Sequence, residues 1–301
     1  GIDPEGIAEA FLINETARCP LVYFSYELLF AHEIENESEA SLKTQEMNAL
    51  RNCDLVLIQD ETRRDLFCND TGYSKERCVM VPVAPIDQQA NKTRYLHDSL
   101  GLPSGNRIIL HQGSLSCWSG RDELEDLVRR LPSRCSFVIH SKSTLSRRAR
   151  LFVENLKRFG CVHATDRPVD ADTLPALTAS ADIGLAVYRP NFDHWTHGDN
   201  LRYIGLASGK LSYYAMCGLP VLTRGGSSVS PIVESHKIGM CYTDASDITS
   251  CVNEIIDNHM HYSYRSRKFY VDVLEPSHRI FNFCDALGSI VATKKPPAFM
   301  S

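Results

Sequence analysis

The chain has 301 residues, of which 43% are hydrophobic and 23% charged, the composition of an ordinary globular protein. A formal net charge of -5 excludes the positive field that attracts nucleic acid, and no apolar run approaches the ~20 residues that span a bilayer. The eleven cysteines include no C-x-x-C pair, so the sequence signals neither a zinc ribbon nor a disulfide framework. These features favour a soluble cytoplasmic protein with reduced thiols.

The first 90 residues alternate helical and strand-like patterns. Ile7 and Phe11 lie at helical spacing, and a polar helix is expected over residues 36–52. Short apolar runs, typical of parallel strands, follow at 21–24, 54–58 and 79–81. Residues 82–91 are rich in Pro, Gln and Asp and predict an interdomain linker. The first domain is therefore short, and because the chain begins with Gly1, we expect that something upstream was removed.

From residue 107 onward, apolar strands and amphipathic helices alternate regularly. Strands are expected at 108–110, 137–139, 161–163, 183–187, 219–222 and 239–242. Six such strands predict one doubly wound parallel sheet, whose ligands bind at the carboxyl ends of the strands. A last amphipathic helix begins at Ile280. We predict an α/β protein with an N-terminal domain over 1–90, a second domain over 91–279, and a C-terminal helix and tail over 280–301.

The segment from Ser208 to Lys210 is the strongest candidate for an anion site. Ser208 is a good N-cap, and Gly209 and Lys210 would then occupy the first turn of a helix. Backbone N–H groups at a helix start attract anions, and a lysine there is disfavoured unless an anion neutralises it. A lysine whose ammonium reaches water is the alternative. The pattern favours a diphosphate at Ser208, Gly209 and Lys210, with no metal ion or other cofactor.

The strand Ala181-Asp-Ile-Gly-Leu-Ala-Val-Tyr188, the Ser-Gly-Lys segment and the run Tyr213–Val221 resemble the donor-binding segment of GT-B fold glycosyltransferases. The resemblance implies two Rossmann-like domains, the first apparently incomplete here, and a C-terminal helix that braces the first domain. It also implies transfer of a sugar from a nucleoside diphosphate sugar to an acceptor hydroxyl, with Lys210 stabilising the departing diphosphate. The loop that carries Asn200 and Arg202 would then face the transferred sugar.

Other positions follow or depart from the family pattern. Gly113 follows the first strand of the second domain, where a glycine lets backbone approach a phosphate or simply makes a tight turn. Ser114 and Ser119 stand where related enzymes carry Arg and Lys, and Arg121 is the expected substitute. Four further residues complete the predicted donor and acceptor contacts. Tyr213 replaces a ribose-binding glutamate, Glu234 would take over its role, Arg167 would lie near the base, and Glu27 would act as base, hold the acceptor or bond nearby N–H groups.

The loop after Tyr188 contains residue types that bind metals or sugars. Asp193, His194, His197 and Asp199 include metal-ligand types, but such loops are usually solvated, so we expect no metal site from them. Trp195 would either stack on an acceptor sugar or pack the loop down.

Three functions remain open from the sequence. The leading one is a glycosyltransferase, and the alternatives are a catalytically inactive GT-B subunit and a sugar-nucleotide epimerase. The expected partners are a nucleotide sugar and an acceptor that is a glycan, a lipid-linked molecule or a small molecule. No nucleic acid is expected, and a peripheral membrane or subunit contact stays open. A dehydrogenase is disfavoured because no G-x-G-x-x-G follows a strand.

Overall fold

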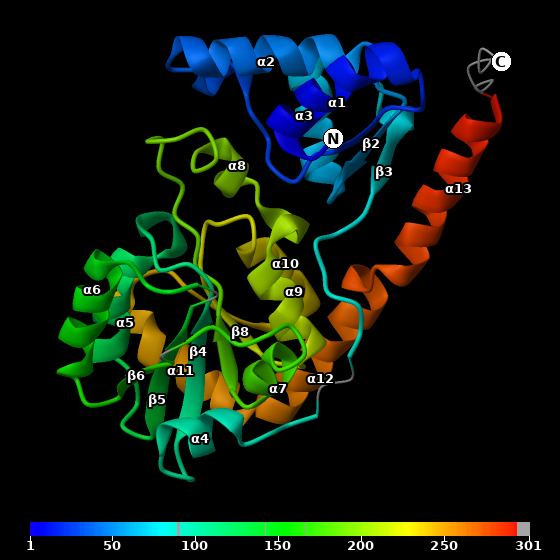
Figure 1. The fold of residues 1–301 in the computed structure, drawn as a ribbon. Coiled ribbons are helices and arrows are strands. Elements are labelled where there is room, and N and C mark those ends of the chain that lie inside the picture. The colour runs from blue at the N-terminus through cyan, green and yellow to red at the C-terminus, as the bar shows by residue number, and fades with distance from the viewer. Residues whose placement is uncertain (89–90, 142, 166, 294–301) are drawn as a thin grey trace. The chain divides into compact units, whose positions relative to one another are not determined.

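A computed structural model describes residues 1–88, 91–141, 143–165 and 167–293 (Figure 1). The chain forms two compact units. The first contains Gly1–Val83, Pro190–Ala207 and the described part of Pro276–Ser301, and the second contains Ala84–Arg189 and Ser208–Glu275. Residues 190–207 thus pack with the first unit, whereas the sequence pattern places them in the second domain. The tail beyond residue 293 lies outside the described residues.

The first unit is built on a parallel sheet of order β1-β2-β3. Its strands are β1 (Val22–Phe24), β2 (Leu55–Ile58) and β3 (Cys78–Met80), which match the three predicted apolar runs. The helices of this unit are α1 (Asp3–Ala17), α2 (Glu37–Leu50), α3 (Glu61–Thr71), α8 (Asp199–Arg202) and α13 (Ser277–Thr293).

Local sequence signals set the helix ends of the first unit. Asn36 accepts a hydrogen bond from the Glu39 N–H and caps α2, and Asp60 caps α3 in the same way. The last helix, α13, lies against this unit's own sheet, where the Phe283 ring packs edge-on to Phe24 with centroids 5.5 Å apart.

The second unit contains a six-stranded parallel sheet of order β6-β5-β4-β7-β8-β9. The strands are β4 (Arg107–Gln112), β5 (Cys135–His140), β6 (Val162–Ala164), β7 (Ile183–Leu185), β8 (Val221–Arg224) and β9 (Gly239–Tyr242). All six lie where the sequence predicts strands, so the predicted doubly wound sheet is confirmed. Successive strands after β4 are added on one side of it (β5, β6), and those from β7 onward are added on the other side (β7, β8, β9). The carboxyl ends of the neighbouring strands β4 and β7 are therefore the topological switch point.

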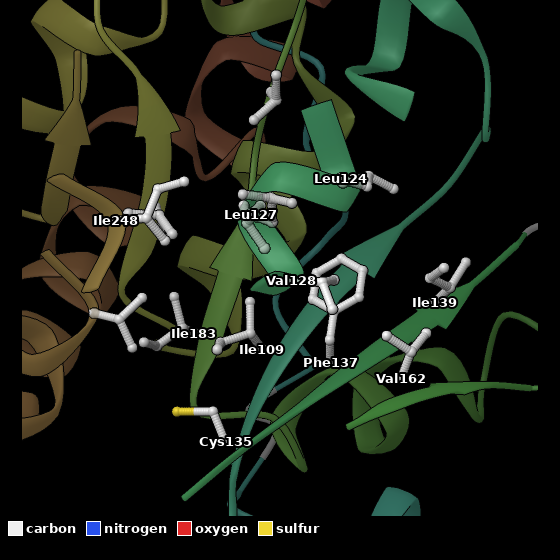
Figure 2. Close-up of a cluster of buried hydrophobic side chains, with 14 of the residues drawn as sticks. Ile109, Leu124, Leu127, Val128, Cys135, Phe137, Ile139, Val162, Ile183 and Ile248 are labelled. Atoms are coloured by element: carbon white, nitrogen blue, oxygen red, sulfur yellow. The ribbon is translucent and has the colours of Figure 1, made fainter. Parts of the chain in front are cut away.

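Helices cover both faces of this sheet (Figure 1). One face carries α5 (Leu124–Arg129), α6 (Arg147–Lys157) and α11 (Ile248–Asp257), and the other carries α7 (Leu174–Ala179), α9 (Gly209–Met216), α10 (Ser230–His236) and α12 (His259–Phe269). The unit also contains α4 (Tyr95–Leu100) and a π-helix over Tyr270–Leu274. Figure 2 shows Leu127 and Val128 of α5 above Ile109 and Phe137 of the sheet. Burial of each such side chain stabilises the fold by roughly 1.5–3 kcal/mol.

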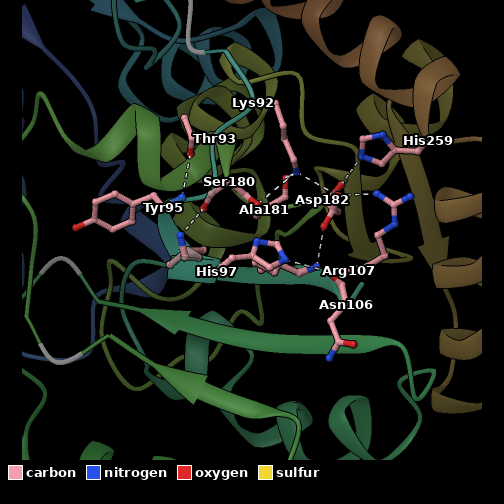
Figure 3. A network of polar contacts seen from close by, with 12 residues as sticks. Lys92, Thr93, Tyr95, His97, Asn106, Arg107, Ser180, Ala181, Asp182 and His259 are labelled. Atoms are coloured by element: carbon pink, nitrogen blue, oxygen red, sulfur yellow. Dashed lines mark hydrogen bonds and ion pairs between the residues drawn. The ribbon is translucent and has the colours of Figure 1, made fainter. Parts of the chain in front are cut away.

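A polar network fixes the amino ends of β4 and β7 (Figure 3). The Asp182 carboxylate is buried and accepts a 2.8 Å hydrogen bond from the Ile108 N–H. Lys92 and Arg107 each pair with its Oδ1 at 3.1 Å. Burial would raise the pKa of Asp182, but Lys92, the Ile108 N–H and Arg107 together lower it. The carboxylate therefore stays ionised and joins the starts of two neighbouring strands.

Candidate functional site

The carboxyl ends of β4 and β7 bring together the residues that the sequence singles out for anion binding. Gly113 follows β4 with a φ of 112°, a conformation that favours glycine. A Cβ at this position would lie 3.3 Å from Cε of Lys210, so the missing side chain leaves room for the lysine. Gly113 and Lys210 thus meet at the switch point, where open α/β sheets bind their ligands.

Ser208 caps α9 as predicted, but the helix start is less open than expected. The Ser208 hydroxyl accepts a 3.1 Å hydrogen bond from the Leu211 N–H and lies 2.6 Å from the Tyr188 hydroxyl. The Tyr188 hydroxyl also takes the Lys210 N–H. Side-chain oxygens therefore satisfy two N–H groups of the first turn, those of Lys210 and Leu211. The diphosphate at this helix start stays a prediction.

The ammonium of Lys210 is buried without a hydrogen-bond partner among the described residues. Its Nζ lies 5.2 Å from the centre of the Tyr188 ring and 6.0 Å from that of Trp118. Burial lowers the pKa of Lys210 to about 7. The residue as a whole is half-buried, and its Nζ atom is buried. A buried ammonium without a partner is costly, and a bound anion would supply the missing partner.

His111, the residue before last in β4, shares this environment. Its side chain is fully buried, and burial together with the charge of Lys210 lowers its pKa to about 3. The ring is therefore neutral, and its Nε2 lies 3.1 Å from the Ser114 carbonyl oxygen, to which it donates in the matching tautomer. Its Nδ1 is buried and has no hydrogen-bond partner in the described part of the chain. The site thus holds one unpaired donor and one unpaired acceptor.

The loop after β4 uses its polar groups internally. The Ser119 hydroxyl is buried and donates to the Ser114 carbonyl at 2.7 Å while accepting from the Ser116 N–H at 2.8 Å. Arg121 pairs with Asp122 at 3.1 Å and also contacts the Cys117 sulfur. The predicted substitute for the missing basic residues is thus already bound to neighbouring groups.

The remaining predicted donor contacts of the second unit are more peripheral. Tyr213 is half-buried on α9, whereas Glu234 on α10 and Arg167 after β6 are exposed. Within the described residues, no hydrogen bond or ion pair joins Glu234 or Arg167 to Lys210. Their assignment to ribose and base stays a prediction.

Glu27 and Asn200 meet inside the first unit. The Asn200 amide nitrogen donates to the Glu27 carboxylate and to the Thr196 carbonyl at 3.0 Å. Its oxygen accepts from the Leu28 N–H at 2.9 Å and from Arg63 at 3.1 Å. Burial raises the pKa of Glu27, and the Asn200 bond works against that shift. Asn200 therefore anchors its loop in the first unit.

Arg63 on α3 organises this loop, although no sequence pattern marks it. It is 1% exposed, and its guanidinium donates to Gln59, to the carbonyls of Tyr26 and Tyr203, and to both oxygens of Asn200. Burial lowers the pKa of Arg63 to about 10. These bonds explain why residues 190–207 belong to the first unit.

The other loop residues are held in place as well. Arg202 pairs with Asp199 at 2.7 Å and lies over the Phe192 ring. Trp195 is 8% exposed and stacks on His194 with ring centroids 5.7 Å apart. The structure thus favours the packing role of Trp195 over sugar stacking.

A cavity of about 680 Å³ lies at the opposite, amino-terminal edge of the second sheet. It is lined by Lys92, Arg107, Asp182, His259 and Arg267, among others. Most of their polar groups already bond one another, as Figure 3 shows for Asp182. Lys210 is therefore the stronger candidate site, because buried polar atoms of the described residues lack partners there.

Comparison with known proteins gives one family match, which covers part of the chain. Residues 155–270 match the family model described as glucosyltransferase 3-like, C-terminal domain. A comparison with curated protein sequences gave no match. The matched segment contains Ser208, Gly209 and Lys210 and therefore includes residues that lie at the switch point.

Several solved structures have the same fold. Anabaena HepE in complex with UDP-glucose has a TM-score of 0.73 at 16% identity, over 95% of this chain and 77% of that one. Sucrose-phosphate synthase from Thermosynechococcus elongatus has a TM-score of 0.73 at 12% identity, over 97% and 73%. WaaG, a glycosyltransferase involved in lipopolysaccharide biosynthesis, has a TM-score of 0.67 at 14% identity, over 95% and 81%. The predicted GT-B fold is confirmed.

Proposed function

We propose that this GT-B chain is a glycosyltransferase that moves a sugar from a nucleoside diphosphate sugar to an acceptor hydroxyl. The observation that carries the proposal is the buried, unpaired ammonium of Lys210 at the switch point of the second sheet. The segment that holds it is the one matched by a glucosyltransferase family model. Because HepE was solved with UDP and with UDP-glucose, a UDP-sugar is the donor to try first.

In this mechanism Lys210 neutralises the charge that develops on the departing diphosphate. A pre-positioned cation in a water-poor site is worth more than one in solution, because it needs no reorganisation during the reaction. The Gly209 N–H adds a backbone donor, and Gly113 leaves the space that the phosphates and the lysine share. Lys210 takes the role that a metal ion has in other transferases.

The compartment and the acceptor belong to the proposal as well. The eleven cysteines are all free thiols, which supports a reducing compartment such as the cytoplasm. In the part of the chain that the structure describes, no helix is both long and apolar enough to cross a bilayer. The acceptor is a hydroxyl compound, either a glycan, a lipid-linked molecule or a small molecule.

The proposal is tested by measuring UDP-glucose binding calorimetrically and UDP release by phosphorus NMR in wild type and Lys210→Ala. Loss of a charge-assisted contact of about 1.5–3 kcal/mol weakens binding roughly 10- to 150-fold. Lys157→Ala, which removes an exposed lysine on α6, is the matched control and binds as wild type. Binding without any UDP release across an acceptor panel would make the chain a sugar-nucleotide-binding subunit instead. Equal binding and turnover in Lys210→Ala would remove Lys210 from the mechanism.

A further inference from the structure

Three side chains with metal-binding atoms converge in the first unit, away from Lys210 in the sequence. His32 and Glu33 lie on the 3₁₀ turn Ala31–Glu33, and Asp199 is the first residue of α8. One ligand atom from each lies within 4.8 Å of the other two. The His32 Nε2 and the Asp199 Oδ2 are 2.9 Å apart. Folding thus assembles an imidazole and two carboxylates from segments that are more than 160 residues apart.

The Asp199 side chain and one carboxylate oxygen of Glu33 are withdrawn from solvent, whereas Glu33 as a whole is half-buried and His32 is exposed. Asp199 is 8% exposed, and the Oε2 atom of Glu33 is buried. That oxygen accepts no hydrogen bond from any residue that the structure describes. A buried carboxylate oxygen without a donor is costly, so its position calls for a ligand with positive charge.

Each candidate ligand is oriented by a further contact. The Asp199 N–H donates to Glu33 Oε1 at 2.6 Å, which leaves Oε2 as the free oxygen. Arg202 pairs with Asp199 Oδ1 at 2.7 Å and leaves Oδ2 toward His32. The His32 ring packs on Phe30 with centroids 5.5 Å apart. Outer contacts that fix the direction of the ligand atoms are characteristic of metal sites.

A cavity of about 160 Å³ adjoins the cluster and limits what it binds. It is lined by His32, Glu33, Glu35, Glu39, Phe192, His194 and Trp195. The cavity is smaller than the roughly 300–1,000 Å³ typical of organic ligand pockets. Three of its lining residues, Glu33, Glu35 and Glu39, are acidic, and none of those lining residues is a lysine or an arginine, so the local charge favours a small cation.

We infer that His32, Glu33 and Asp199 bind a divalent transition-metal ion, such as Zn²⁺, in the first unit. One imidazole nitrogen and two carboxylate oxygens form a donor set that suits Zn²⁺ and similar ions better than Ca²⁺, which prefers oxygen alone. Asp199 belongs to the loop from which no metal site is expected by sequence. His32 and Glu33, which complete the set, are remote in the chain. The site is independent of the proposed transferase activity.

The test is a titration of the chelator-treated 301-residue chain with Zn²⁺ in competition with a chromophoric chelator. Wild type is expected to bind one equivalent, and its Co²⁺ form to show a visible absorption band. His32→Ala, Glu33→Gln and Asp199→Asn each weaken Zn²⁺ binding by about tenfold or more. Glu33→Gln keeps the shape of the side chain, and circular dichroism verifies that each variant is folded.

His261→Ala removes an exposed histidine on α12 and serves as the control, with binding as in wild type. Absence of a stoichiometric Zn²⁺ site in wild type would overturn the inference. So would unchanged Zn²⁺ affinity in folded Glu33→Gln and His32→Ala, because the ion would then bind elsewhere.

Discussion

The Tyr188 ring lies under the ammonium of Lys210, with 5.2 Å between Nζ and the ring centre, while its hydroxyl contacts the cap residue Ser208. The ring face attracts the cation by roughly 0.5–2 kcal/mol, which is less than a buried ammonium loses with its water. Tyr188 thus positions Lys210 without neutralising it. The site keeps an uncompensated charge that a diphosphate can take up.

The affinity for UDP-glucose is predicted to fall as the pH rises above about 7. The pKa of Lys210 in the free protein is about 7, and the protonated form binds the anion. Affinity is therefore constant below the pKa and decreases above it by up to about tenfold per pH unit. Calorimetry at several pH values measures this slope. Lys210→Met should bind weakly with a flat profile, and a flat profile in wild type would contradict the prediction.

Lys210→Met is predicted to raise the thermal stability of the protein near pH 6. The folded-state pKa of about 7 lies below the ordinary value of 10.5, so the unfolded chain binds more protons between these values. The unfolding free energy of wild type, relative to that of the variant, therefore increases as the pH rises from 7 toward 10.5. Below pH 7 wild type is less stable than the variant by the largest amount. Melting curves of both proteins from pH 6 to 9.5 give the difference. A difference that does not change with pH would show that the ammonium is solvated in the folded state.

Gly113→Ala is predicted to weaken donor binding and to destabilise the fold by about 1 kcal/mol. The residue has a φ of 112°, and the new Cβ would press on the Lys210 side chain. Gly105→Ala is a matched control, because a Cβ there meets no atom within 4 Å. Denaturant unfolding and UDP-glucose titration measure the two effects. Wild-type affinity in Gly113→Ala would mean that the lysine has more room than the structure gives it.

Arg63→Met is predicted to cost about 3–5 kcal/mol of unfolding free energy, the loss typical when one partner of a buried charged network is removed. It leaves the Tyr26, Asn200 and Tyr203 carbonyls without their donor. Hydrogen exchange in residues 190–207 should accelerate, which mass spectrometry of peptides detects. Arg64→Met, next to it on α3 and paired with the half-exposed Asp65, is the control with little expected change. Unchanged exchange in the loop would show that Arg63 does not hold it.

The sequence predicts the second unit well because its information is local. Apolar runs locate all six strands, and the Ser208 cap and the Lys210 first turn follow from residue type and spacing. Right-handed crossovers also predict that all strands end at one edge of the sheet. The strand order, and with it the switch point, comes from the structure. These features need no knowledge of distant contacts.

What the sequence does not reveal depends on contacts between remote segments. The Tyr188 hydroxyl reaches the start of α9 across a 20-residue loop, and nothing in the pattern of that loop signals this. Arg63 looks like a solvated charge on a polar helix, yet it is fully enclosed by partners up to 140 positions away. His32 and Glu33 likewise form a possible ligand set only because folding brings them close to Asp199.

The path of the chain has a practical consequence for dissecting this molecule. Because Pro190–Ala207 packs with the first unit, the second unit is not one continuous stretch of polypeptide. A fragment spanning 84–275 would still contain residues 190–207 but would lack Arg63 and Glu27. The polar groups of that segment that bind these two residues would then have lost their partners. The second unit alone should instead be engineered by excising 190–207 and joining Arg189 to Ser208 through a short glycine-serine linker.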